Sequence, residues 1–186
     1  MVQRSIILQS GQRYINIMHE ASYIAPLDHL NPITSRETIL KNASALVHGE
    51  SSLMANCANI ASLVFHSLPD LSWCGWYLLQ NDILVLGPFM GKPACTRIMI
   101  GRGVCGTAAA ERRSVVVDDV HSFDGHIACD PDTRSELVVP LMSNDALIGV
   151  FDLDSPVPAR FSAEDARFIE SLCRLVADSS LIGSVS

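Results

Sequence analysis

The chain has 186 residues, of which 48% are hydrophobic and 18% are charged, and its formal net charge is −7. This length fits one domain with its own core, and the composition excludes a disordered chain. The negative charge is the wrong sign for a protein that binds the phosphate backbone of nucleic acids. No apolar run approaches the roughly 20 residues of a bilayer span. We therefore expect a cytoplasmic protein that binds neither nucleic acid nor membrane.

The first predicted elements are two helices that follow a poorly patterned N-terminus. Residues 1–33 show little periodicity, and we treat them as an N-terminal extension of a domain that spans 34–182. The pattern Thr34-Ser35-Arg36-Glu37 is typical of a capping box, which predicts a helix that begins there and ends near Gly49. Apolar residues at helical spacing predict a second helix over 51–68.

Short strands dominate the rest of the chain. Two hairpins are predicted, with turns at Asn81-Asp82 and at 143–145. A helix at 104–112 lies between the hairpins, and 121–134 is predicted to be a polar loop. The pattern Ser162-Ala163-Glu164-Asp165 predicts the start of a last helix. Helices that flank hairpin strands indicate an α+β domain with one antiparallel sheet. The predicted strands are 73–79, 83–86, 97–100, 115–117, 136–142 and 147–154.

The six cysteines fall into two groups. In a cytoplasmic chain they are expected to be reduced thiols. Cys57 and Cys173 lie on predicted helices, where packing is the usual role of a free thiol, and Cys74 lies in a strand that leaves its direction open. The cysteines that lie in turns or loops, where thiol redox chemistry is favoured, are Cys95, Cys105 and Cys129.

The residues beside the loop cysteines predict different acidities. Cys105 lies at a helix start near Arg102, a placement that lowers the pKa of a thiol. Cys129 has acidic neighbours, Asp124, Asp130 and Asp132, which are expected to raise its pKa. From the residues alone, Cys105 is therefore the better candidate for a reactive thiolate.

Two other site types fit the sequence less well. Gly101-Arg102-Gly103-Val104-Cys105-Gly106 matches the glycine pattern of dinucleotide sites, but the hairpin context and the missing ribose-binding acid favour a glycine-rich turn. A zinc-binding interaction module is the other alternative, and structural zinc sites favour closely spaced cysteine pairs, which this chain lacks. Its candidate ligands are Cys95, Cys105, Cys129, His121 and His126.

Three acidic residues lie on the second hairpin. Glu136 opens one strand, and the two-residue spacing of Asp152 and Asp154 places both on the same face of the other strand. Carboxylates this close repel one another, so one of them is expected to hold its proton near neutral pH. Spacing alone leaves two interpretations open, a solvent-facing polar stripe or a partly enclosed site.

The chain resembles the free methionine-(R)-sulfoxide reductases, which are GAF-domain enzymes. The resemblance covers about residues 34–180 and rests on an ordered series of blocks. These are Trp73-Cys-Gly-Trp-Tyr77, Leu86-Gly-Pro-Phe-Met-Gly-Lys-Pro-Ala-Cys95, Gly101-Arg-Gly-Val-Cys-Gly-Thr107, Asp124-Gly-His-Ile-Ala-Cys129, Ser135-Glu-Leu-Val-Val-Pro140 and Gly149-Val-Phe-Asp-Leu-Asp154.

This resemblance implies a single GAF domain, with a six-stranded antiparallel sheet, helices on one face and the pocket on the other. It implies thioredoxin-dependent reduction of free methionine-R-sulfoxide, with no metal or organic cofactor, and a homodimer is compatible with it. Cys129 would attack the sulfoxide and Cys95 would resolve, with Cys105 as the alternative partner. Glu136, Asp152 and Asp154 would be the acidic pocket residues, Asp154 with Glu136 giving the proton, and Trp73 and Tyr77 the aromatic wall.

Two consequences and one alternative follow. Glycines 101, 103 and 106 would bring backbone N–H groups close to the substrate carboxylate. Carboxylates that bind the substrate ammonium would reject methionine sulfoxide with a blocked amine. The alternative function is that of a GAF-type sensor, which binds a small ligand without catalysis; such a module does not need the loop cysteines.

Overall fold

The computed structural model describes residues 35–125 and 130–181, so the extension predicted for 1–33 lies outside the described residues. Its elements follow the predicted order, and each predicted helix and strand is present. They are α1 (Arg36–Val47), α2 (Leu53–Ser67), β1 (Trp73–Gln80), β2 (Ile83–Met90), β3 (Arg97–Met99), α3 (Gly103–Glu111), β4 (Val115–Val117), the 3₁₀ helix η1 (Val120–Ser122), β5 (Ser135–Ser143), β6 (Ala146–Ser155) and α4 (Ala163–Leu181).

Serine caps fix where the helices begin. The Ser35 hydroxyl accepts a hydrogen bond from the backbone N–H of Thr38 at 3.2 Å, so Ser35 is the N-cap of α1, one residue later than a box opened by Thr34. At α4 the predicted capping box is confirmed. The N–H of Asp165 donates to the Ser162 hydroxyl at 3.2 Å, and the N–H of Ser162 donates to the Asp165 carboxylate at 2.9 Å.

Left-handed turn residues close both predicted hairpins. Asn81 and Asp82 have φ of 48° and 63°, and Asn144 and Asp145 have φ of 45° and 66°. Two consecutive residues with positive φ are typical of a type I′ turn, whose twist matches that of the adjoining strands. These turns set the pairing of β1 with β2 and of β5 with β6, and the second pairing aligns the acidic residues described below.

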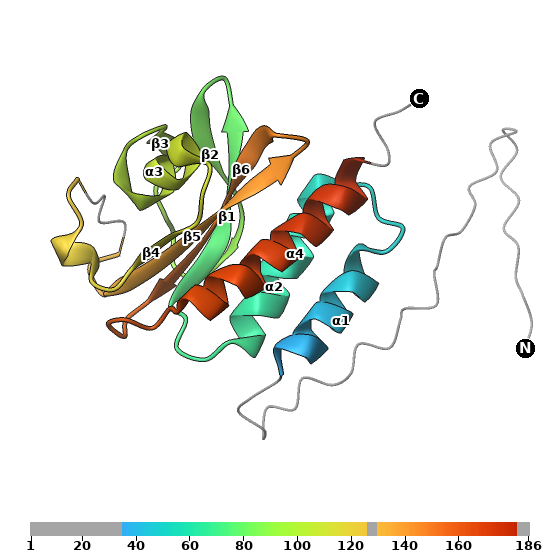
Figure 1. Ribbon diagram of the computed structural model, residues 1–186, viewed down its shortest axis with the longest axis horizontal. Helices are drawn as coiled ribbons and strands as arrows, with labels where there is room; N and C mark the ends of the chain where they lie inside the picture. Colours follow the sequence, from blue (N-terminus) through green and yellow to red (C-terminus); the bar gives the residue numbers. More distant parts are fainter. Residues whose placement is uncertain (1–34, 126–129, 182–186) are drawn as a thin grey trace, which may run out of the picture.

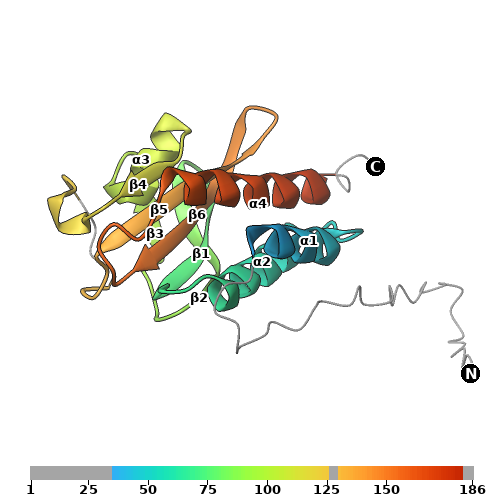
Figure 2. The same cartoon turned by 60° about the horizontal axis from the view of Figure 1, so that its bottom comes forward.

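The sheet is antiparallel between all neighbours, in the order β3-β2-β1-β6-β5-β4. Helices α2 and α4 pack on one face, and α1 packs on α2 and α4 (Figures 1 and 2). The core between them includes the stacked rings of Trp76 and Phe151, whose centroids are 4.1 Å apart. Helix α3 packs on the opposite face, against β5 and β6. The predicted α+β fold is confirmed, with α3 added on the second face.

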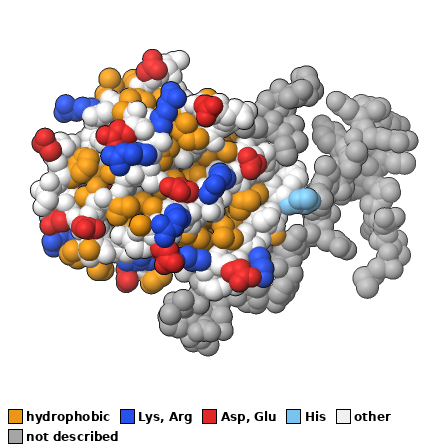
Figure 3. All heavy atoms as spheres, in the orientation of Figure 1, with side chains coloured by type: hydrophobic (Ala, Val, Ile, Leu, Met, Phe, Trp, Pro, Cys, Tyr) orange, Lys and Arg blue, Asp and Glu red, His pale blue; other side chains and the backbone are white. Residues whose placement is uncertain are grey.

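The face that carries α1 and α4 mixes Lys and Arg with Asp and Glu, so neither sign forms one continuous patch there (Figure 3). Within 35–125 and 130–181, none of the helices has the length and apolarity that a bilayer span requires.

Candidate active site

A pocket lies on the side of the sheet that carries α3. Its walls come from β1, β3, β5, β6, the start of α3, the segment that follows β2 and the segment that precedes β5. These parts bring aromatic, acidic and thiol side chains together with basic and apolar ones. The lining residues are Trp73, Tyr77, Lys92, Pro93, Ala94, Ile98, Arg102, Gly103, Val104, Cys105, Asp130, Thr133, Glu136, Asp152 and Asp154.

Strand register gathers the three predicted acids at this pocket. Glu136 on β5 pairs with Asp154 on β6, and Asp154 pairs in turn with Trp73 on β1. Asp152 lies two residues earlier on β6 and on the same face, as the period-two spacing predicted. Glu136 and Asp152 are each only 6% exposed. The acids therefore form a partly enclosed cluster and not a solvent-facing stripe.

Burial favours the protonated form of the three carboxyl groups. It raises the pKa of Glu136 well above its usual range, and the nearby Asp152 and Asp154 raise it further. Burial also raises the pKa of Asp152 to about 7. The pKa of Asp154 is raised well above its ordinary value by burial and by the charge of Asp152. Neutral carboxyl groups are therefore present near neutral pH, which is the form that can donate a proton to a substrate.

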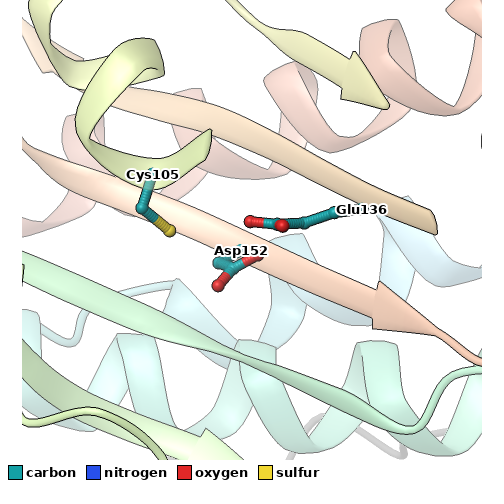
Figure 4. Close-up of side chains that lie close together, drawn as sticks. All are labelled: Cys105, Glu136 and Asp152. Atoms are coloured by element: carbon teal, nitrogen blue, oxygen red, sulfur yellow. The ribbon is translucent and has the colours of Figure 1, made fainter. Parts of the chain in front are cut away.

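Cys105 lies in the first turn of α3 and points toward Asp152 and Glu136 (Figure 4). The side chain is buried. Burial raises the pKa of its thiol well above 9.0, and the charges of Asp152 and Glu136 raise it further. The expectation that the helix start and Arg102 lower this pKa was wrong. Desolvation and two carboxyl groups outweigh the helix terminus, so Cys105 is a thiol and not a thiolate.

Trp73 and Tyr77 form the predicted aromatic wall. Their ring centroids lie 6.0 Å apart, and both side chains are almost fully buried. The indole Nε1 of Trp73 donates to the backbone oxygen of Lys92, and the Tyr77 hydroxyl donates to that of Cys95, both at 3.0 Å. A Cβ at Gly75 would lie 2.3 Å from Cβ of Phe89 and 2.6 Å from Cη2 of Trp73, so the glycine on β1 leaves the room that both side chains occupy.

The structure places the described cysteines on both faces of the sheet. Cys57 and Cys173 are free thiols buried in the core between the sheet and the helices, and Cys74 points into the same core. Cys95 lies beside the pocket and takes part in a disulfide bond, so the expectation of a reduced thiol was wrong at this position. Cys129, assigned to the attack on the sulfoxide, and His126 lie outside the described residues. His121 lies on η1 and does not line the pocket.

Lys92 and Thr133 line the pocket and were missed by the sequence analysis. The ammonium of Lys92 lies 2.9 Å from a carboxylate oxygen of Asp130 and 2.9 Å from one of Asp132. Asp130 and Asp132, two of the acids expected to raise the pKa of Cys129, are thus paired with Lys92, and Cys129 itself lies outside the described residues. The available sequence signal for a pocket role of Lys92 was its position three residues before Cys95. Its partners Asp130 and Asp132 lie 38 and 40 residues further along the chain.

The glycine-rich turn does not present its amides as expected. The N–H of Gly101 donates to the oxygen of Gly106 at 2.7 Å, and the N–H of Gly106 donates to the oxygen of Arg102 at 3.1 Å. A Cβ at Gly106 would collide with the backbone oxygen of Met99, which explains the glycine. The amides of Gly101 and Gly106 are thus used within the turn. Of the three glycines, Gly103 lines the pocket.

Comparison with known proteins identifies the domain family and several similar proteins. The GAF domain pattern matches residues 35–179. The free methionine-R-sulfoxide reductase of Escherichia coli (strain K12) is 50% identical over 132 residues, which cover 71% of this chain and 80% of that protein. The enzyme of the same name from Saccharomyces cerevisiae (strain ATCC 204508 / S288c) is 39% identical over 166 residues, covering 85% of this chain and 92% of that protein.

A solved structure extends the similarity to the fold. It is the free methionine-R-sulfoxide reductase of Neisseria meningitidis in complex with its substrate. That protein is 41% identical, with a TM-score of 0.75, and the match covers 78% of this chain and 87% of the other. The chain therefore belongs to the free methionine-R-sulfoxide reductases, a family of oxidoreductases built on the GAF domain.

Proposed function

We propose that this protein reduces free L-methionine-(R)-sulfoxide to L-methionine in the cytoplasm, with thioredoxin as the reductant. The observation that carries the proposal is the carboxyl cluster of buried Glu136 and Asp152 and half-buried Asp154, which shares its pocket with two aromatic rings and lies beside redox-capable cysteines. The named activity of the relatives supports the same substrate.

The pocket offers one group for each end of the substrate. A carboxylate of the cluster pairs with the substrate ammonium, and a neutral carboxyl group donates a proton to the sulfoxide oxygen. We assign proton donation to Glu136 with Asp154. The rings of Trp73 and Tyr77 cover the ε-methyl end and exclude water. Binding of the cationic ammonium favours ionisation of one carboxyl group of the cluster while another keeps its proton.

The chemistry needs two thiols for each turnover. The attacking thiolate bonds to the sulfoxide sulfur while the sulfoxide oxygen takes up the proton from the carboxyl group. The resulting hydroxyl group then moves to the cysteine sulfur as the bond between the two sulfurs breaks, which gives methionine and a cysteine sulfenic acid. The second thiol attacks the sulfenic acid, which gives a disulfide and water. The dithiol of thioredoxin then reduces this disulfide by exchange and is itself oxidised.

We assign the attack to Cys129 and the resolution to Cys95, following the family resemblance. In support, Cys95 is disulfide-bonded here, whereas Cys105 is a free thiol. Burial and two neighbouring carboxyl groups raise the pKa of Cys105, which leaves it poorly suited to either step.

The test is methionine formation from free methionine-R-sulfoxide by the wild type and three variants, with thioredoxin, thioredoxin reductase and NADPH. Cys129→Ser is expected to form no methionine. Cys95→Ser is expected to complete one turnover but not to be recycled by thioredoxin. Cys57→Ser, in the core on the other side of the sheet, is the control and keeps wild-type turnover. Saturable substrate binding by a wild type that forms no methionine would instead favour a sensor.

A further inference from the structure

Cys105, Glu136 and Asp152 form a compact set of potential metal ligands. One ligand atom from each, the thiol sulfur and two carboxyl oxygens, lies within 4.8 Å of the others. The three side chains come from α3, β5 and β6 and converge from two sides of the pocket (Figure 4). Each is at least nine-tenths buried, so the set is held by regular elements and packing.

A second observation indicates that this set is built to take a ligand. The Oδ1 atom of Asp152 is buried and has no hydrogen-bond partner among the residues that the structure describes. Asp152 is 6% exposed and lines the pocket. A buried oxygen left without a partner costs about 1–3 kcal/mol, so such atoms in native proteins commonly face a water, an ion or a substrate.

One sulfur and two oxygen ligand atoms favour some metal ions over others. Thiolate sulfur disfavours Mg²⁺ and Ca²⁺, which prefer oxygen ligands, whereas zinc accepts both cysteine and carboxylate. Zinc bonds of about 2.3 Å to sulfur and about 2.0–2.2 Å to oxygen place tetrahedral ligand atoms less than 4.8 Å apart, which is the limit within which the three atoms lie here. Three protein ligands leave a fourth tetrahedral position for water.

We propose that the pocket carries an inhibitory zinc site, with the sulfur of Cys105 and the carboxylates of Glu136 and Asp152 as its ligands. Zn²⁺ replaces the protons of these groups, which are released to solvent. Zinc on Asp152 takes the carboxylate that is left to pair with the methionine sulfoxide ammonium, and zinc on Glu136 takes a group assigned to proton donation, so zinc competes with the substrate. The competition, though not the site, rests on the proposed function.

The site is tested without any activity measurement by titrating the reduced protein with Zn²⁺ in a calorimeter and with Co²⁺ in a spectrophotometer. Co²⁺ bound to a thiolate gives a sulfur-to-cobalt charge-transfer band in the near ultraviolet. We expect one ion per chain and this band. Cys105→Ser is expected to lose the band, and Asp152→Asn and Glu136→Gln to weaken Zn²⁺ binding at least about tenfold.

Matched controls separate this site from other thiols. Cys95→Ser removes a thiol beside the pocket, Cys173→Ser removes one from the opposite core, and both are expected to keep the band and the affinity. Thermal melts check that every variant is folded. Absence of saturable binding, or a band that persists in folded Cys105→Ser, would overturn the proposal.

The activity measurement is a separate arm of the test. Zn²⁺ is expected to raise the apparent KM for methionine-R-sulfoxide in proportion to its concentration and to leave kcat unchanged. A zinc-binding protein without reductase activity would refute the proposed function and leave the site standing. An active enzyme that binds no zinc would refute the zinc site and leave the proposed function standing.

Discussion

Replacing Glu136 with glutamine tests whether a buried neutral carboxyl group supplies the proton for sulfoxide reduction. Glu136 is 6% exposed and lies opposite Asp154, and burial and its acidic neighbours raise its pKa. Near neutral pH the protonated side chain matches glutamine in charge and closely in shape, so the free energy of unfolding should change by less than about 1 kcal/mol. An amide cannot give up a proton in the same way. We expect kcat to fall by about 10²–10⁴, the usual contribution of a general acid.

That fall corresponds to about 2.7–5.4 kcal/mol in the activation barrier. The assay is the thioredoxin-coupled initial rate over a range of substrate concentrations, together with urea unfolding of the same samples. Glu111→Gln is the matched control, because Glu111 ends α3, pairs with Arg113 on the surface and does not line the pocket. A Glu136→Gln variant that folds normally and keeps kcat within threefold of wild type would refute this role.

Two further predictions concern pH. Burial raises the pKa values of Glu136 and Asp154, the groups assigned to proton donation, so the rate of a single turnover should decline as rising pH ionises them. A profile without this descending limb would contradict a neutral acid. Burial opposes ionisation of Asp165, but hydrogen bonds from Ser162 and Arg36 outweigh it and lower the pKa of this carboxyl group. The ionised Asp165 therefore stabilises the fold at neutral pH, and this stabilisation is lost as pH falls through the lowered pKa. Asp165→Asn should lower the free energy of unfolding by about 1–2 kcal/mol at pH 7, and an equal loss at pH 3 would contradict this reasoning.

The features that the sequence predicted best depend on local signals. Asn81-Asp82 suits a left-handed hairpin turn, and both of its residues have positive φ. Ser162 and Asp165 are three residues apart and cap each other. The alternation of side chains along β6 placed Asp152 and Asp154 on one face without any knowledge of the pocket.

The failed predictions concern contacts between distant parts of the chain. The acidity of Cys105 was predicted from the helix start and Arg102, but it is set by Asp152, which is 47 residues away in the sequence, and by burial. Lys92 was missed because its partners lie on a loop far along the chain. The amides of Gly101 and Gly106 are taken up inside their own turn, a result that depends on how closely β3 approaches α3.

Recognition of the free substrate ammonium by buried carboxyl groups is tested by a comparison of two substrates. Initial rates are measured on free methionine-R-sulfoxide and on its N-acetyl derivative, with the same enzyme and thioredoxin. An acetylated amine is neutral and leaves a buried carboxylate without its partner, which costs about 1–3 kcal/mol or more for a charged group. We expect reduction of the free R-epimer, little of the S-epimer and essentially none of the acetylated compound. Equal rates on the free and acetylated R-epimers would contradict this expectation.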